Sequence, residues 1–75
     1  MATLRIDAGR TDKLRAGDIV GALTGEAKLH KDAIGKIDVF ATRSYVAIAR
    51  RQADNALSAL RQGKIKGRKF RVNRL

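Results

Sequence analysis

The chain has 75 residues, which is enough for one domain spanning residues 1–75 but too few for a second core. It has no cysteine and one histidine, His30, which excludes disulfides and Cys/His zinc sites. Charges interrupt every apolar run before it could span a membrane or form a signal core. We therefore expect a soluble, cytoplasmic protein that does not associate with membranes.

The charge is strongly unbalanced, because seventeen Lys and Arg residues stand against seven Asp and Glu residues, for a net charge of +10. So large an excess repels itself unless the working state includes a polyanion, and nucleic acid is the commonest one. A membrane surface is the rival partner, but the basic residues do not gather on one long amphipathic helix. Composition therefore favours a nucleic-acid partner.

The first part of the chain predicts a strand followed by a helix. Residues 3–7 alternate polar and apolar, so Leu4 and Ile6 should point inward from a strand. Residues 9–15 form a basic connection. The next apolar residues have the i, i+3, i+4, i+7 spacing of one helix face: Ala16, Ile19, Val20 and Leu23. Gly25 stands where a left-handed cap would end this helix.

The middle of the chain predicts an antiparallel hairpin. Residues 34–40 are expected to form one strand, with Ile37 and Val39 inward. Residues 44–49 are expected to form the next, with Val46 and Ile48 inward. The short turn at residues 41–43 makes the two strands neighbours.

A second helix and a last strand complete the pattern. The helix is indicated by Ala53, Ala56, Leu57 and Leu60, and Gly63 marks its end. Residues 70–73 alternate again, with Phe70 and Val72 inward. The order is an α+β, split βαβ fold like that of RNA recognition motifs: a four-stranded antiparallel sheet with two helices on one face. This topology hosts many functions, so it does not settle the function alone.

Four segments together resemble the C-terminal RNA-binding domain of DbpA-type DEAD-box RNA helicases. They are Arg15-Ala16-Gly17-Asp18-Ile19-Val20-Gly21-Ala22-Leu23, Ile34-Gly35-Lys36-Ile37, Ser44-Tyr45-Val46 and Ile65-Lys66-Gly67-Arg68. The resemblance spans nearly the whole chain. It implies an atypical RNA recognition motif that tethers an ATP-dependent helicase core to structured RNA, a 23S ribosomal RNA hairpin near the peptidyl-transferase centre, in large ribosomal subunit assembly.

One position departs from the family pattern. Relatives commonly have a glycine where this chain has Lys28, before Leu29. A glycine there could supply a positive φ, which a lysine adopts less readily. Two interpretations follow: Lys28 is natural surface variation, or it adds a phosphate contact and strains the loop.

The sheet face away from the helices is predicted to lack most of a base-stacking platform. Arg5, Asp7, Tyr45 and Ala47 should face outward on the two central strands. RNA recognition motifs usually place two or three stacking aromatics on these strands, whereas here Arg5 and Arg43 occupy such positions. Tyr45 either stacks on a base or packs half-buried against Arg5. Phe40 is a further candidate for an exposed ring on the second strand.

Two basic segments are the main candidates for binding phosphates. Arg10, Lys13 and Arg15 enter the first helix, where free N–H groups add attraction for an anion. Residues 61–75 carry seven basic residues and no acidic one. This run is either a solvated tail or a fixed surface anchored by Ile65, Phe70 and Val72. The candidate RNA contacts are Arg5, Arg10, Lys13, Arg15, Lys28, Lys31, Arg43, Tyr45, Lys64, Lys66, Arg68, Lys69 and Arg71.

We expect no enzymatic activity and no cofactor in this chain alone. The acidic residues are scattered, and His30 lies beside Lys31 in a predicted loop, where we expect it to be solvated. Asp18 is better explained as a partner of the helix dipole. The repeated glycines Gly17, Gly21 and Gly25 lack a Walker pattern, so we expect them to allow close packing of helix on sheet. An ATP site would belong to the helicase core, outside this chain.

Two other functions stay open. A basic protein-interaction or assembly module would be favoured by a large exposed apolar patch. A non-specific nucleic-acid-binding domain, for example one that binds DNA, would be told apart by comparing duplex DNA with structured RNA at one salt concentration. We expect the domain to be a monomer.

Overall fold

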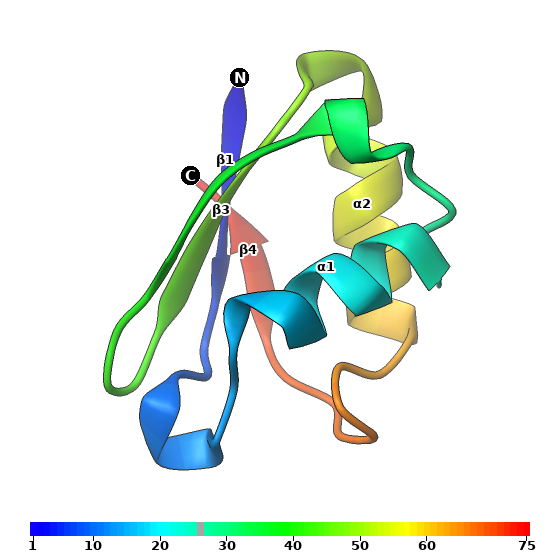
Figure 1. The fold of residues 1–75 in the computed structure, drawn as a ribbon. Helices are drawn as coiled ribbons and strands as arrows, with labels where there is room; N and C mark the ends of the chain where they lie inside the picture. Colours follow the sequence, from blue (N-terminus) through cyan, green and yellow to red (C-terminus); the bar gives the residue numbers. More distant parts are fainter. Residues whose placement is uncertain (26) are drawn as a thin grey trace.

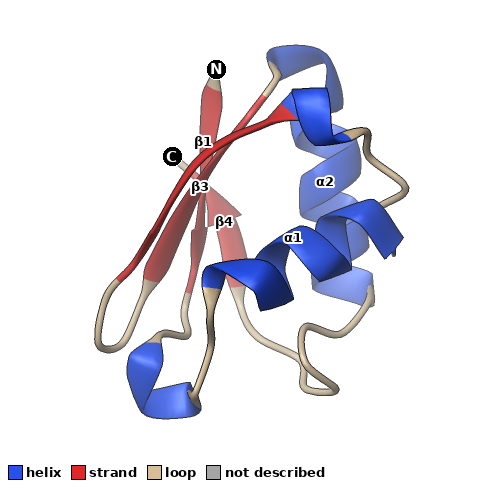
Figure 2. Ribbon diagram, viewed as in Figure 1, coloured by secondary structure: helices blue, strands red, loops and turns tan. Residues whose placement is uncertain are grey.

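A computed structural model describes residues 1–25 and 27–75; Glu26, one of the scattered acidic residues, lies outside the described residues. The predicted order of strands and helices is confirmed (Figures 1 and 2). The elements are β1 (Ala2–Ile6), η1 (Arg10–Asp12), α1 (Ala16–Gly25), η2 (Lys31–Ala33), β2 (Ile34–Val39), β3 (Ser44–Ile48), α2 (Arg50–Gln62) and β4 (Val72–Arg74). The 3₁₀ helices η1 and η2 were not predicted.

The strands form one antiparallel sheet in the order β2-β3-β1-β4, and both α helices cover the same face of it (Figure 2). The α+β, split βαβ prediction is therefore confirmed. In register, Arg5 of β1 lies between Tyr45 of β3 and Asn73 of β4. The two ends of the chain are also neighbours, because the N–H of Leu75 donates to the carbonyl oxygen of Thr3 at 2.9 Å.

The core forms between the sheet and the helices, because strand residues alternate between buried and partly exposed positions. The predicted inward residues of β1 and β3 are fully buried: Leu4, Ile6, Val46 and Ile48. From the helices, α2 contributes Ala53, Ala56 and Leu60, and α1 contributes Ile19, Ala22 and Leu23. The prediction that Ala16 belongs to this face is wrong, since Ala16 is exposed.

The predicted helix ends at Gly25 and Gly63 are confirmed, but the left-handed conformation predicted for Gly25 is wrong. Gly25 is the last residue of α1, and the left-handed residue that follows is Lys28, with φ of 55°. The chain continues to turn past Gly25, because the N–H of Leu29 donates to the carbonyl oxygen of Leu23 at 3.0 Å and Leu29 is buried. Gly63 does end α2, but in an extended conformation (φ −90°, ψ −166°).

The last strand begins later than predicted. β4 starts at Val72, whereas Phe70 precedes it as a half-buried ring packed against the core. The guanidinium of Arg68 lies 5.3 Å from the centre of the Phe70 ring. Residues 65–68 form a tight turn and do not pair with β1. Pairing with β1 therefore starts only at Arg71, whose carbonyl oxygen accepts the N–H of Asp7 at 2.8 Å.

Over the ranges 1–25 and 27–75, no helix combines the length and the apolar character that crossing a bilayer requires.

Candidate nucleic-acid interface

The basic connection before α1 is fixed against the hairpin of β2 and β3. The N–H of Arg10 donates to the carbonyl oxygen of Phe40 at 2.8 Å, and the N–H and hydroxyl of Thr11 both donate to the carbonyl oxygen of Ala41 at 2.9 Å. Gly9 makes this approach possible, because a Cβ there would overlap the Phe40 carbonyl. The charges of the connection are thus held in place by the backbone.

Lys13 is held in a left-handed backbone conformation, with φ of 60°. Such a conformation costs an L-residue roughly 1–2 kcal/mol, so neighbouring structure must enforce it. Leu14 supplies one constraint, because its side chain is buried in the core. The side chains of Lys13 and Arg15 therefore project outward on either side of a buried anchor.

A second basic segment makes a tight two-residue turn at Lys66 and Gly67. Main-chain hydrogen bonds of 2.8 and 3.0 Å join Ile65 and Arg68, and Ile65 is buried. Both central residues have positive φ, 54° for Lys66 and 75° for Gly67, which is the pattern of a type I′ turn. The predicted anchoring by Ile65, Phe70 and Val72 is confirmed, since Ile65 and Val72 are buried and Phe70 packs on the core.

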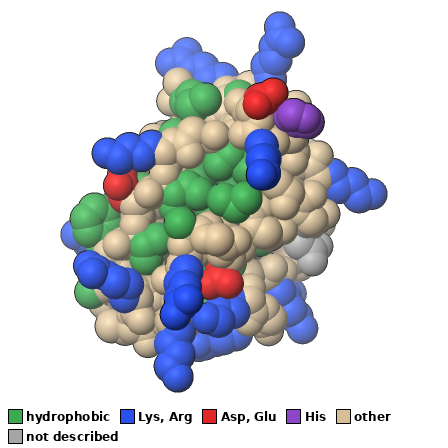
Figure 3. Space-filling model, in the orientation of Figure 1, with side chains coloured by type: hydrophobic (Ala, Val, Ile, Leu, Met, Phe, Trp, Pro, Cys, Tyr) green, Lys and Arg blue, Asp and Glu red, His purple; other side chains and the backbone are tan. Residues whose placement is uncertain are grey.

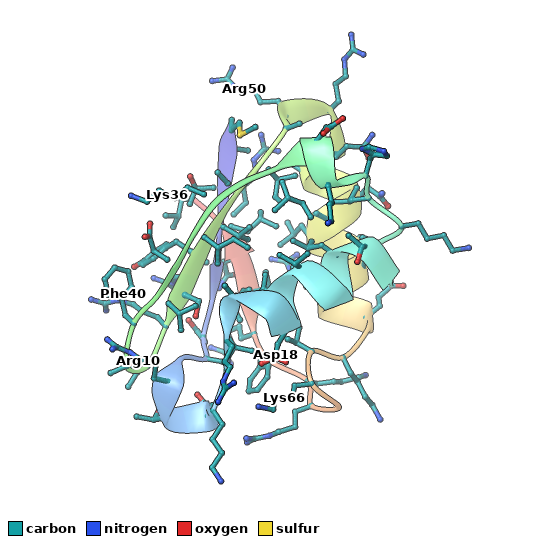
Figure 4. All side chains as sticks on the ribbon, in the orientation of Figure 1. Arg10, Asp18, Lys36, Phe40, Arg50 and Lys66 are labelled. Carbon is teal, nitrogen blue, oxygen red and sulfur yellow. The ribbon has the colours of Figure 1, made fainter. Side chains whose placement is uncertain are left out.

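The two segments are tied together at the start of α1. The ammonium of Lys66 donates to the carbonyl oxygen of Lys13 at 2.6 Å, and it lies 3.7 Å from Asp18 Oδ2. Arg68 lies 3.9 Å from Asp12. Figure 4 shows Asp18 and Lys66 beside one another below α1. The surface between the segments is a hollow of about 320 Å³ lined by Arg10, Lys13, Leu14, Arg15 and Lys66, which we call the basic hollow.

The carboxylates near the basic hollow brace the backbone. Asp18 Oδ2 accepts the N–H of Arg15 at 2.9 Å, so the predicted interaction of Asp18 with the helix N-terminus takes the form of a cap. The side chains of Arg10, Lys13 and Arg15, in contrast, form no ion pair with another described residue. Lys and Arg side chains gather at this end of the molecule (Figure 3). The hollow is therefore suited to an anion.

The three repeated glycines of α1 face solvent rather than the sheet, so the prediction of close helix-to-sheet packing is wrong. A Cβ added at Gly17, Gly21 or Gly25 would meet nothing within 4 Å. The buried stripe of α1 lies on the other side of the helix. The glycines line a second hollow of about 440 Å³ with Asp18, Ala22, Lys64 and Lys66, which we call the glycine hollow. Lys66 lines both hollows, so the glycine hollow along α1 adjoins the basic hollow.

The two aromatic residues predicted to be exposed near the open sheet face, Phe40 and Tyr45, contact each other. The Phe40 and Tyr45 rings meet edge to face, with centroids 5.8 Å apart and an interplanar angle of 76°. Tyr45 is half-buried, and Phe40 lies just after β2 with 46% of its surface exposed. Arg5, opposite Tyr45, has a buried Nε that lies 3.4 Å from Asp7 without hydrogen-bond geometry. Both interpretations of Tyr45 stay open.

The remaining predicted contacts are spread over the surface. Arg43 lies in the loop before β3, Lys64 lines the glycine hollow, and Lys69 and Arg71 are exposed on either side of Phe70. α1 is about 15 Å long, and Lys28 and Lys31 follow its far end and do not line the basic hollow. The structure therefore does not bring these two lysines to the basic hollow. All of these RNA contacts stay predictions.

Arg61 and Arg74, which are not among the candidate RNA contacts, form hydrogen bonds and ion pairs within the domain. Arg61 Nε donates to the carbonyl oxygen of Val72 at 2.9 Å, and Arg74 pairs with Asp54 at 3.0 Å. The exposed His30 accepts the N–H of Asp32 at 3.4 Å and so caps η2. Outside position 26, no three His, Cys, Asp or Glu side chains are grouped to hold a metal ion.

Known proteins match this chain over nearly all of its length. The family model described as the DbpA RNA binding domain matches residues 3–74. The chain is also 48% identical over 75 residues to the ATP-dependent RNA helicase DbpA of Escherichia coli (strain K12). That match covers 100% of this chain but only 16% of the relative, so the chain spans a small part of that helicase. The chain belongs to the DbpA RNA-binding domain family.

Proposed function

We propose that this RNA-binding domain tethers a DEAD-box ATP-dependent RNA helicase core, in the same parent chain, to a hairpin of 23S ribosomal RNA during large ribosomal subunit assembly. The domain itself contributes binding and no catalysis, and it works as a cytoplasmic monomer. The observation that carries the proposal is the hydrogen bond from Lys66 to Lys13, which fixes two distant basic segments around one hollow.

Structured RNA is the ligand best suited to such a surface. Folded RNA is recognised mostly through phosphates, 2′-hydroxyls and groove shape. Charges that are anchored by Leu14 and Ile65 stand at set distances, and only a folded backbone holds its phosphates at set distances too. The glycine hollow supports the same conclusion, because the absence of side chains there leaves room for a sugar-phosphate backbone to approach α1.

A competition titration tests this proposal. The domain is titrated with a ribosomal-type hairpin and its flanking junction, and separately with an unpaired RNA of equal length and composition, at two salt concentrations. We expect tighter binding of the hairpin, by a margin that survives moderate salt. Equal affinities throughout would mean that the domain is only a basic anchor. Duplex DNA at the same salt concentration serves as the control for non-specific nucleic-acid binding.

A protein-interaction or assembly module is a second candidate, favoured by one observation. Apolar side chains form a patch on the face of the molecule seen in Figure 3. Ile34, Ile37 and Val39 of the edge strand β2 are only partly buried against the core. Size-exclusion chromatography with a separately produced helicase core would test this function. Complex formation lost on Ile37→Lys, while RNA binding is kept, would support it.

A further inference from the structure

The hairpin of β2 and β3 carries an aromatic pair, Phe40 in its loop and Tyr45 in β3, and neither ring lines the basic hollow. The Phe40 and Tyr45 rings meet at 76°, so they form two walls of a corner rather than a parallel stack. Phe40 is 46% exposed, whereas the inward-facing apolar residues of β1 and β3 are fully buried. A planar group that enters this corner can stack on one ring and contact the edge of the other.

This corner adjoins the connection that carries the basic hollow. The carbonyl oxygen of Phe40 accepts the N–H of Arg10, so the aromatic ring and a lining residue of the hollow belong to directly bonded segments. The absence of a side chain at Gly9 lets the loop pack down on the connection. In Figure 4, Phe40 and Arg10 lie at the same end of the hairpin. A polyanion held in the hollow therefore has a short path to the rings.

The charges around the corner favour an anionic ligand. Asp38, the register partner of Tyr45, lies 3.8 Å from Lys36, and Asp7 lies 3.4 Å from Arg5, so both carboxylates have a cation beside them. Arg43 is exposed in the loop between the two rings and forms no ion pair with a described residue. The excess charge beside the rings is thus positive.

We propose that Phe40 and Tyr45, with Arg43 on the backbone phosphate, form a stacking site for one unpaired nucleotide that extends from the RNA held in the basic hollow. The proposal rests on the proposed function, because the hollow supplies the main attachment. Stacking on an aromatic ring is tolerant of sequence, since every base has a π face. The site would therefore detect an unpaired extension beside a hairpin rather than a particular base.

The experiment compares two forms of one hairpin, blunt and with a short unpaired extension that contains 2-aminopurine, an adenine analogue whose fluorescence falls on stacking. Extensions at the 5′ and 3′ ends are tested separately. We expect Phe40→Leu to weaken binding of one extended hairpin about tenfold, within the range measured for base–aromatic stacking. The same variant should abolish the fluorescence change and leave the blunt hairpin bound as before. Phe40→Trp should retain both signals.

Two controls separate this inference from the proposed function. Leu75→Ala removes another exposed apolar side chain, far along the sequence, and should change neither affinity. Neutralising Arg10, Lys13 and Arg15 together should weaken both hairpins; if it weakens neither, the proposed function fails. If instead Phe40→Leu weakens both hairpins equally or neither one, with thermal unfolding unchanged, the stacking site is overturned. If Phe40 binds a protein partner instead, Phe40→Leu should weaken neither hairpin.

Discussion

Lys66 donates a hydrogen bond to the carbonyl oxygen of Lys13 at 2.6 Å, and both lysines have left-handed backbone conformations. Each conformation is unfavourable alone, by roughly 1–2 kcal/mol. Their contact joins segments 53 residues apart and sets the shape of the basic hollow. Backbone strain is thus concentrated where the proposed RNA contacts lie.

Lys66→Met should weaken binding of the structured hairpin by about tenfold. The change removes both a positive charge and a charge-assisted hydrogen bond, and such bonds contribute roughly 1.5–3 kcal/mol. Lys36→Met is the matched control, because Lys36 is an exposed lysine on β2. Fluorescence anisotropy at fixed salt gives both affinities. Equal losses in the two variants would show that only net charge matters.

Binding should weaken steeply as salt rises. If about four to six phosphates are neutralised, a plot of log K against log salt should have a slope of roughly −3 to −6. Titrations at several potassium chloride concentrations measure the slope. A value near zero would contradict the phosphate-binding model.

The connection before α1 should matter more than the centre of the sheet for binding the blunt hairpin. Neutralising Arg10, Lys13 and Arg15 together removes three charges without an ion-pair partner among the described residues. Arg5→Ala should reduce affinity less, because Arg5 already pairs with Asp7. Tyr45→Ala should also reduce affinity less, because the blunt hairpin has no unpaired extension to stack on the ring. The three variants are compared by titration under one condition. The open sheet face would be the main RNA reader if Tyr45→Ala proved the most damaging.

Two glycine substitutions should change stability in opposite directions. Gly21→Ala should raise the free energy of unfolding by about 0.5–1 kcal/mol, because alanine is the better helix former and its Cβ meets open space. Gly9→Ala should lower that free energy by about 1–3 kcal/mol, because its Cβ would overlap the Phe40 carbonyl. Urea unfolding measures both. A destabilised Gly21→Ala variant would mean that α1 packs differently there.

Lys28→Gly should raise the free energy of unfolding by about 0.5 kcal/mol. Glycine relieves a left-handed φ of 55°, although its greater freedom in the unfolded chain offsets part of the gain. Lys31→Gly is the control, since Lys31 lies in η2 outside the left-handed region and should only lose stability. Urea unfolding at one pH compares them. Equal destabilisation of the two variants would contradict the strain assigned to Lys28.

Local patterns were sufficient to predict the sheet and helices but not the details of α1. The alternation in β1 and β3 follows burial residue by residue, so Leu4 and Val46 could be assigned inward from sequence. For Gly21, spacing shows which residues share a face but not whether that face is buried. Likewise, glycine preference pointed to Gly25 as the left-handed residue, whereas burial of Leu29 moves the reversal to Lys28.

The basic segments of the site were predictable, but their arrangement was not. Charge density identifies Lys13 and Lys66 as candidates, but their contact spans 53 positions and depends on how two turns meet. The contact between the Phe40 and Tyr45 rings could not be predicted for the same reason. Phe40 stands five residues from Tyr45, and only the hairpin geometry brings the two rings together.

The hydrogen bond from Leu75 to Thr3 also determines where anything attached to this domain must begin. Both ends of the chain lie beside the first residues of β1, whereas the basic connection follows the last residue of that strand, Ile6 (Figure 1). A five-residue strand extends about 17 Å. A segment joined to either end would therefore start at a fixed offset from RNA in the basic hollow, so the domain would serve as a rigid spacer as well as an anchor.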